Sequence, residues 1–165
     1  MDQPEKCAWA SAYQNQDIIW VRTESGFRDS AYDPQGKETV LRVDADDNAL
    51  GVAVTEALAQ SRFLSLEEAR TFLDYRIGMK IYDERIRSLV ESEGYKNKAA
   101  LFRRMKHCSI TLEKGIIKIG PTIHDGSNAW GRNKSDGLED VVIASDRPVN
   151  EIGTALRLGF SRSVE

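Results

Sequence analysis

The sequence predicts an α/β protein of the α+β type, with helices packed on a single sheet of about five strands. Short β-branched and aromatic segments lie towards both ends of the chain, apolar residues at helical spacing fill its middle, and turn residues separate these segments. With 165 residues, the chain is long enough to bury a core without disulfides. We therefore expect one domain over residues 1–165, with a flexible polar segment at residues 1–15.

Two strands are expected in the first third of the chain. Residues 17–23 are short, β-branched and aromatic, which is typical of a buried strand, and residues 39–43 form the second candidate. Residues 24–37 between them contain Gly26, Pro34 and Gly36, so we expect a turn or an irregular loop there.

The first helix is predicted after a cluster of acids. Asp44, Asp46 and Asp47 precede apolar residues at helical spacing and stand where a helix N-terminus favours negative charge. The helix is expected to run to about Ser61. The acids lack the calcium-loop pattern of an EF-hand, which leaves capping as their predicted role.

Further helices should follow in the middle of the chain. Ser65 and Glu68 form a capping-box pattern, which predicts a helix through Ile77 that Gly78 ends or kinks. The other helical segments are expected over residues 82–94 and 98–105.

The last third predicts a hairpin, a strand and a terminal helix. Residues 109–113 alternate in polarity, and Lys114-Gly115 separates them from the apolar residues 116–119, as in a tight β-hairpin. Residues 138–144 supply another strand. Pro148 fits the first turn of a helix whose buried stripe is Ile152, Ala155, Leu156 and Phe160.

Charge and cysteine content indicate the compartment and exclude some partners. The net charge of −3 and the pI of about 5.5 give no global basic excess, so we expect no direct contact with nucleic acid. Cys7 and Cys108 lie far apart and predict no disulfide, which favours a reducing cytoplasm. No signal-peptide pattern or long apolar run is present, so we expect no membrane association.

No catalytic or metal-binding motif emerges from the spacing. His107 and Cys108 are adjacent on an expected strand and so should point to opposite faces; with His124 and Cys7 they give no workable set. The glycines of the last third form no phosphate-binding loop. We predict no catalytic residue, no metal and no cofactor.

Trp130 stands in a polar loop, residues 125–137, where no periodicity explains an aromatic residue. Two interpretations stay open: the indole folds back onto the sheet, or it is a surface anchor, since Trp is enriched at interface hot spots.

Three stretches carry a family resemblance. They are residues 94–102 before the hairpin, Pro121 with His124 and the later Trp130, and the last strand followed by residues 151–157. Together they resemble the immunity proteins of contact-dependent growth inhibition systems. The resemblance implies a cytoplasmic, non-enzymatic inhibitor. Its partner would be the C-terminal toxin domain of a cognate CdiA effector, often a nuclease acting on tRNA or other nucleic acid, in a 1:1 heterodimer.

An acidic surface suits such a partner, because a nuclease must present a basic cleft to phosphate. The candidate toxin-binding residues are acids and possible anchors of the predicted loops: Glu24, Asp29, Tyr32, Asp33, His124, Asp125, Trp130, Asp136 and Glu139. The alternative is a small enzyme with His124 as general base, oriented by Asp125 or Asp136.

Overall fold

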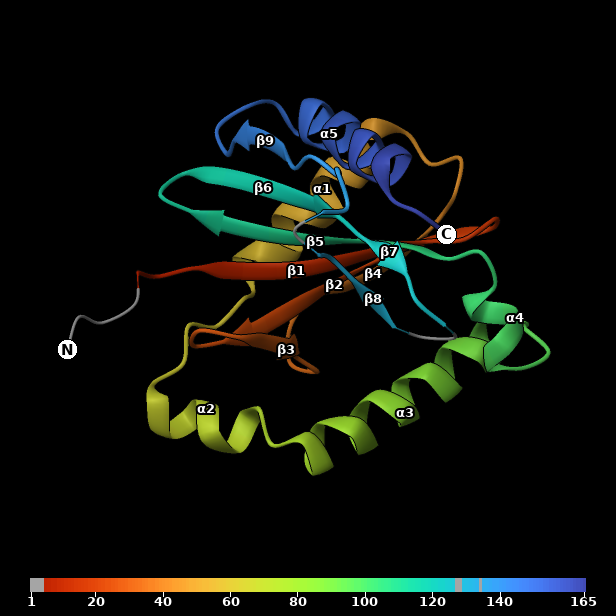
Figure 1. The fold of residues 1–165 in the computed structure, drawn as a ribbon, viewed down its shortest axis with the longest axis horizontal. Helices are drawn as coiled ribbons and strands as arrows, with labels where there is room; N and C mark the ends of the chain where they lie inside the picture. Colours follow the sequence, from red (N-terminus) through yellow and green to blue (C-terminus); the bar gives the residue numbers. More distant parts are fainter. Residues whose placement is uncertain (1–4, 127–128, 134) are drawn as a thin grey trace.

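The computed structural model describes residues 5–126, 129–133 and 135–165. A seven-stranded antiparallel sheet carries helices on both faces, beside a separate two-stranded sheet (Figure 1). The α+β class is confirmed, and the main sheet has more strands than the five predicted. The main sheet contains β1 (Ala8–Gln14), β2 (Ile18–Gly26), β3 (Ser30–Tyr32), β4 (Glu38–Arg42), β5 (Lys106–Glu113), β6 (Ile116–Pro121) and β9 (Val141–Ala144).

The remaining elements are helical or belong to the small sheet. The small sheet pairs β7 (Ile123–His124) with β8 (Trp130–Gly131). The helices are α1 (Asp47–Ala59), α2 (Leu66–Phe72), α3 (Tyr75–Ser92), α4 (Lys98–Phe102) and α5 (Val149–Arg162).

Strand β2 organises one side of the sheet. Its inner edge pairs with β1, and its outer edge is divided between β4, opposite residues 18–22, and β3, opposite residues 24–26. The strand order is β3-β2-β1-β5-β6-β9, with β4 also on β2. The short β3 therefore ends the sheet beside the second half of β2.

The N-terminal segment is not flexible over its whole length, which corrects the prediction for residues 1–15. Residues 8–14 form β1 in the middle of the sheet, between β2 and β5. Residues 1–4 lie outside the described part of the chain. Ala10 and Ala12 are buried against the helices, and Trp9 and Tyr13 are buried on the other face.

The predicted loop over residues 24–37 is also corrected. Residues 24–26 continue β2, and β3 returns beside them as a short hairpin. Glu24 therefore lies on a strand, not in a loop.

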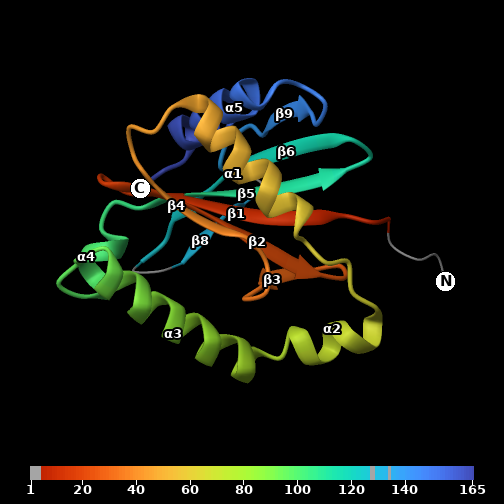
Figure 2. The same cartoon turned by 180° about the vertical axis from the view of Figure 1, so that it is seen from behind.

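The two faces of the sheet carry separate apolar clusters. On one face, Ile19 and Val21 of β2 pack with the buried stripes of α1 and α5. On the other face, Ile18 and Trp20 pack with α3, α4 and Met105. Figure 2 shows α1 and α5 crossing the first face. The helices α2, α3 and α4 follow one another along the opposite side of the molecule, beyond β3. The helices on the second face include α3, which borders the candidate site described below.

Glycines bring α1 and α5 together. A Cβ atom added at Gly51 would overlap the backbone of Val149, and one at Gly153 would overlap the backbone of Asp47. Both glycines are buried. The helices can cross at backbone contact only because these positions carry no side chain.

Helix starts follow the predicted caps. Asp46 Oδ1 accepts a hydrogen bond from the Ala49 amide at 2.7 Å, and the Ser65–Glu68 capping box is formed. The prediction of one helix through Ile77 was wrong. Helix α2 ends at Phe72, and Asp74 caps α3, which runs through Gly78 without a break.

The C-terminal third matches its prediction closely. Lys114 and Gly115 both have positive φ, as a two-residue hairpin turn requires, and join β5 to β6. Helix α5 begins after Pro148 and buries the predicted stripe of Ile152, Ala155, Leu156 and Phe160.

Candidate functional site

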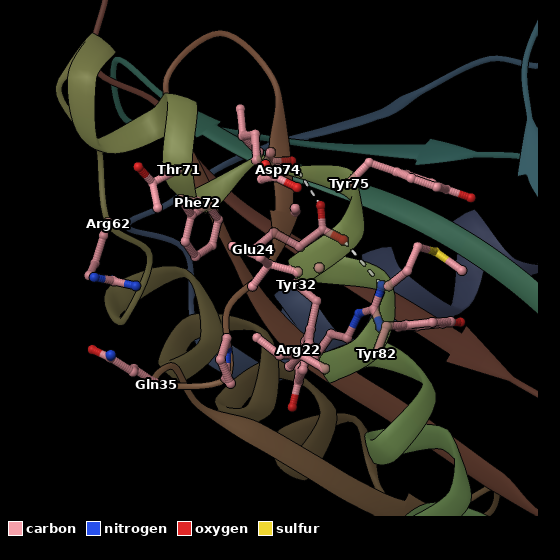
Figure 3. Close-up of a pocket in the computed structure, with 18 residues that line it drawn as sticks. Arg22, Glu24, Tyr32, Gln35, Arg62, Thr71, Phe72, Asp74, Tyr75 and Tyr82 are labelled. Carbon is pink, nitrogen blue, oxygen red and sulfur yellow. Dashed lines mark hydrogen bonds and ion pairs between the residues drawn. The ribbon is translucent and has the colours of Figure 1, made fainter.

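A well-formed cavity lies between β2, β3 and the α2–α3 segment. Its volume is about 530 Å³, and Figure 3 shows its lining side chains. Arg22, Glu24, Tyr32 and Tyr82 lie close together there, with Phe72 and Arg62 at the other end (Figure 3). We call it the β3–α3 pocket.

Arg22 is held inside a cage of aromatic rings. Its side chain is only 7% exposed, and its Cζ lies 5.0 Å from the ring centroids of Tyr13, Trp20 and Tyr32. The Tyr82 ring is 5.2 Å away. Nη2 donates to Tyr13 Oη at 2.9 Å, while Nε and Nη1 are buried without an acceptor among the described residues. The rings attract the cation where hydrogen bonds are missing.

Glu24 balances the charge of Arg22. Its Oε2 lies 3.6 Å from Arg22 Nη2, and its two oxygens accept from Ser11 Oγ at 2.5 Å and Ser30 Oγ at 2.8 Å. Burial raises the pKa of Glu24, but the Arg22 charge and the two hydroxyls outweigh burial, so the net shift is downward. The carboxylate is therefore ionised and engaged.

A second ion pair borders the same pocket. Arg62 donates to Asp33 through Nε at 2.8 Å and Nη2 at 3.0 Å, a bidentate arrangement, and its Cζ lies 5.5 Å from the Phe72 ring centroid. Asp33 also accepts from Ser25 Oγ at 2.6 Å, and its side chain is fully buried. Asp33 holds the β2–β3 segment to the chain that follows α1.

The rim of the pocket is apolar and open to solvent. Tyr75 is 76% exposed and Ile77 is 51% exposed at the start of α3. The buried residues of α3, Ile86 and Leu89, both lie in its second half. The start of α3 therefore borders the pocket, and the helix packs against the second-face cluster from Tyr82 onwards.

A polar network continues from Glu24 behind the pocket. His107 Nε2 lies 3.3 Å from Ser11 Oγ, and Nδ1 lies 3.2 Å from Thr122 Oγ1. Burial lowers the pKa of His107 to about 4, so the imidazole is neutral at pH 7. Ser11 stands between the imidazole and the Glu24 carboxylate and is only 3% exposed. A nucleophilic triad needs the histidine in the middle and an accessible hydroxyl, so the network is structural.

His107 and Cys108 point to opposite faces, as their adjacency predicted. Cys108 lies in the cluster beneath α5, and burial raises the pKa of its thiol to about 12. His107 instead contacts the Tyr13 ring at a centroid distance of 4.7 Å. Both cysteines are free.

The indole of Trp130 folds back onto the second face, as the first of its two interpretations predicts, and its role as an anchor for the toxin stays a prediction. Nε1 donates to the Met105 carbonyl at 2.9 Å, and the ring contacts Tyr13 and Phe102 edge-on. His124 stacks on the other side at 4.7 Å with an interplanar angle of 15°. Residues 127, 128 and 134 of this loop lie outside the described residues.

The nine predicted toxin-binding residues fall into two separate groups. Glu24 and Tyr32 line the β3–α3 pocket, with Asp33 buried behind it and Asp29 exposed in the β2–β3 turn. In the other group, His124, Asp125 and Trp130 line a hollow at the small sheet. Asp136 pairs with Arg132 of that hollow, and Glu139 lies in the segment that leads to β9.

Three of the six acids are engaged within the protein. Besides Glu24 and Asp33, the Asp136 side chain is only 3% exposed, and its pairing with Arg132 lowers its pKa to about 2. Asp136 is therefore paired with Arg132. The enzyme alternative had offered either Asp136 or Asp125 as the group that orients His124. The exposed acids of the six are Asp29, Asp125 and Glu139.

Sequence reasoning missed the residues that give the pocket its character: Arg22, Tyr82, Phe72, Tyr75 and Ile77. One signal was available. A cation inside an otherwise apolar, buried strand must find partners, and Arg22 shares a strand face with Trp20 and Glu24. The distant Tyr82 carries no comparable signal.

The arrangement suits binding better than reaction chemistry. Within the described ranges, no group of three or more His, Cys, Asp or Glu side chains could hold a metal ion. None of the described helices combines the length and apolar composition that a membrane span needs. A mostly apolar pocket with an exposed aromatic rim is a candidate binding surface.

The chain belongs to the CDI immunity protein family. The family model described as CdiI, CDI immunity protein, matches residues 8–163. The immunity protein CdiI-YPIII of Yersinia pseudotuberculosis serotype O:3 (strain YPIII) is 37% identical over 175 residues, which cover 98% of each protein. The family resemblance drawn from the sequence is confirmed.

Two solved structures are similar over nearly the whole chain. One is a CdiA-CT/CdiI toxin and immunity complex from Yersinia pseudotuberculosis, with a TM-score of 0.86 and 34% identity, covering 96% of this chain and 98% of that one. The other is a protein of unknown function, NMB0488, from Neisseria meningitidis, with a TM-score of 0.89 and 32% identity over 99% of both chains.

Proposed function

We propose that this protein binds and neutralises the C-terminal toxin domain of a cognate CdiA effector, as a 1:1 heterodimer in the cytoplasm of the cell that makes it. The observation that carries the proposal is the full-length likeness to a chain of a solved toxin and immunity complex. Identity of 34% over 96% of this chain supports a shared mode of action as well as a shared fold.

The toxin is proposed to be a nuclease, such as a tRNase. The support is electrostatic, since the chain carries a net charge of −3 and its exposed loop acids suit a basic nucleic-acid cleft. Among the predicted toxin-binding acids, Asp29, Asp125 and Glu139 are exposed and can face a partner surface. Inhibition would then be steric and electrostatic, with no reaction carried out by the immunity protein.

Co-expression tests the proposal directly. Cells producing the toxin domain encoded beside this gene should stop growing, and cells that also produce this chain should grow normally. A catalytically dead toxin serves as the growth control, and an unrelated toxin domain tests specificity. Growth arrest despite abundant folded immunity protein would refute the proposal. Intact tRNA in cells arrested by the toxin would exclude a tRNase, and intact RNA and DNA together would refute the nuclease part.

A further inference from the structure

The β3–α3 pocket is balanced in charge. Its charged lining consists of two guanidinium groups, Arg22 and Arg62, and two carboxylates, Glu24 and Asp74. Each has a partner. The pairs with Glu24 and Asp33 occupy the two arginines, and Asp74 Oδ1 accepts from the Arg76 amide at 2.9 Å. Both guanidinium groups are thus already paired, and Asp74, exposed at the rim, accepts only a backbone amide among the described residues. An anionic guest inside the pocket would lose its hydration without finding an unpaired cation.

The donors of Arg22 that lack acceptors do not change this balance. Nε and Nη1 are fully buried, and the guanidinium is surrounded by rings that include Tyr32 and Tyr82. The rings of Tyr32 and Tyr82 line the pocket beside Arg22. This wall of the pocket is therefore largely aromatic.

The rest of the lining is mainly apolar. Phe72, Leu73, Ile77, Met79 and Ile81 come from α2, α3 and the link between them. A volume of about 530 Å³ lies within the range of binding pockets. Such a lining gains free energy by burying apolar surface, roughly 25 cal/mol for each Å².

The first half of α3 presents an unfilled apolar surface. Tyr75 and Ile77 are more than half exposed, although the helix is otherwise anchored by Ile86 and Leu89. Aromatic and aliphatic groups of this kind around a pocket are typical of interface hot spots.

From these observations we propose that the β3–α3 pocket receives an apolar side chain, aromatic or aliphatic, of the toxin domain. This inference rests on the proposed function and names the chemistry of the contact that holds the complex together. The exposed acids then guide association, while the pocket limits dissociation.

The test measures binding of the purified cognate toxin domain by calorimetry. Gly78 lines the pocket in the middle of α3, and a Cβ added there meets no atom within 4 Å. Gly78→Trp should therefore fold, with improved helix propensity, while its indole obstructs the pocket. Ile77→Asp places a charge on the rim. Both variants should weaken binding by at least about 30-fold.

Val142→Asp is the matched control, because Val142 is 59% exposed on β9, far along the strand order from β3. It should bind within about threefold of the wild type. Thermal melting of each variant distinguishes a loss of binding from a loss of folding. If Gly78→Trp does not fold, the binding of Ile77→Asp tests the role of the pocket.

The outcomes separate this inference from the function on which it rests. If the wild type binds and both pocket variants bind equally well, the pocket is not the anchor and the immunity function stands. If both variants lose binding only as much as Val142→Asp does, the inference is likewise overturned. If the wild type itself does not bind, the proposed function fails and the inference with it.

Discussion

Arg22 and Glu24 lie two positions apart on β2, so both side chains leave the same face of the sheet and meet, with Nη2 3.6 Å from Oε2. The Arg22 side chain is 7% exposed and that of Glu24 is 15% exposed. Neither charge is hydrated enough to be stable without the other. The pair therefore fixes the wall of the β3–α3 pocket and makes it neutral.

Removing one partner of this pair should cost more than removing both. Arg22→Met leaves the Glu24 carboxylate buried without its cation and should lower the free energy of unfolding by about 3 kcal/mol. Arg22→Met combined with Glu24→Gln should lose less than the sum of the two single changes. Urea denaturation of the four proteins measures the coupling. Additivity within about 0.5 kcal/mol would show that the two charges do not interact.

Glycine at the α1–α5 crossing should be essential for stability. A Cβ at Gly153 would overlap the α1 backbone at Asp47, so Gly153→Ala should destabilise the protein by about 2 kcal/mol. Gly78→Ala is the matched control. Its Cβ meets open space in α3, so the same change should stabilise the protein by up to about 1 kcal/mol. Equal melting temperatures for the two variants would contradict the crossing geometry.

His107 should make stability depend on pH. Its folded pKa of about 4 lies below the ordinary value of 6.5, so the unfolded chain binds a proton in this window that the folded protein does not. Stability from this group is complete above pH 6.5 and falls as the pH drops towards 4, by about 3 kcal/mol at most.

The control is His107→Gln, which has no titrating ring. Its unfolding free energy should change less between pH 7 and pH 4 than that of the wild type. Identical pH profiles for both proteins would mean that His107 does not keep its neutral form in the fold.

Exposed acids should influence the rate of association with the toxin more than the stability of the fold. Reversing Asp29, Asp125 and Glu139 to Lys together should slow association and reduce its salt dependence, with a melting temperature near that of the wild type. Stopped-flow mixing with the toxin domain at several salt concentrations measures this.

A control triple variant carries the same charge change on other exposed acids, Asp44, Glu56 and Asp146. It should slow association less, because only charges near the interface steer the encounter. Equal slowing by both triple variants would show that net charge, not the proposed loops, sets the rate.

The sequence predicted the elements whose signals are local. The Lys114-Gly115 turn, the Ser65 capping box and the stripe of α5 each depend on residues a few positions apart. Strand β1 was missed because its alternate alanines have low β propensity. Ala10 and Ala12 pack where helices lie close to the sheet, which favours small side chains. This packing involves distant parts of the chain, so the sequence of the strand alone does not indicate it.

The pocket depends on contacts between distant segments, which explains why it was not predicted. Ile77 fitted a buried helical stripe, but the break at Asp74 starts a new helix and leaves Ile77 half exposed. Tyr82 meets Arg22 across 60 positions of sequence, and Asp33 meets Arg62 across 29. Three of the six predicted toxin-binding acids, Glu24, Asp33 and Asp136, are already paired with arginines of the same chain.

Calorimetric titration of the purified chain with the purified toxin domain encoded beside it tests the central claim most directly. Immunity by direct binding predicts a saturable heat with one toxin per chain. The dissociation constant should be about 1 µM or lower, which corresponds to a binding free energy of about −8 kcal/mol or a more negative value. Absence of binding between two proteins that circular dichroism shows to be folded would contradict the claim.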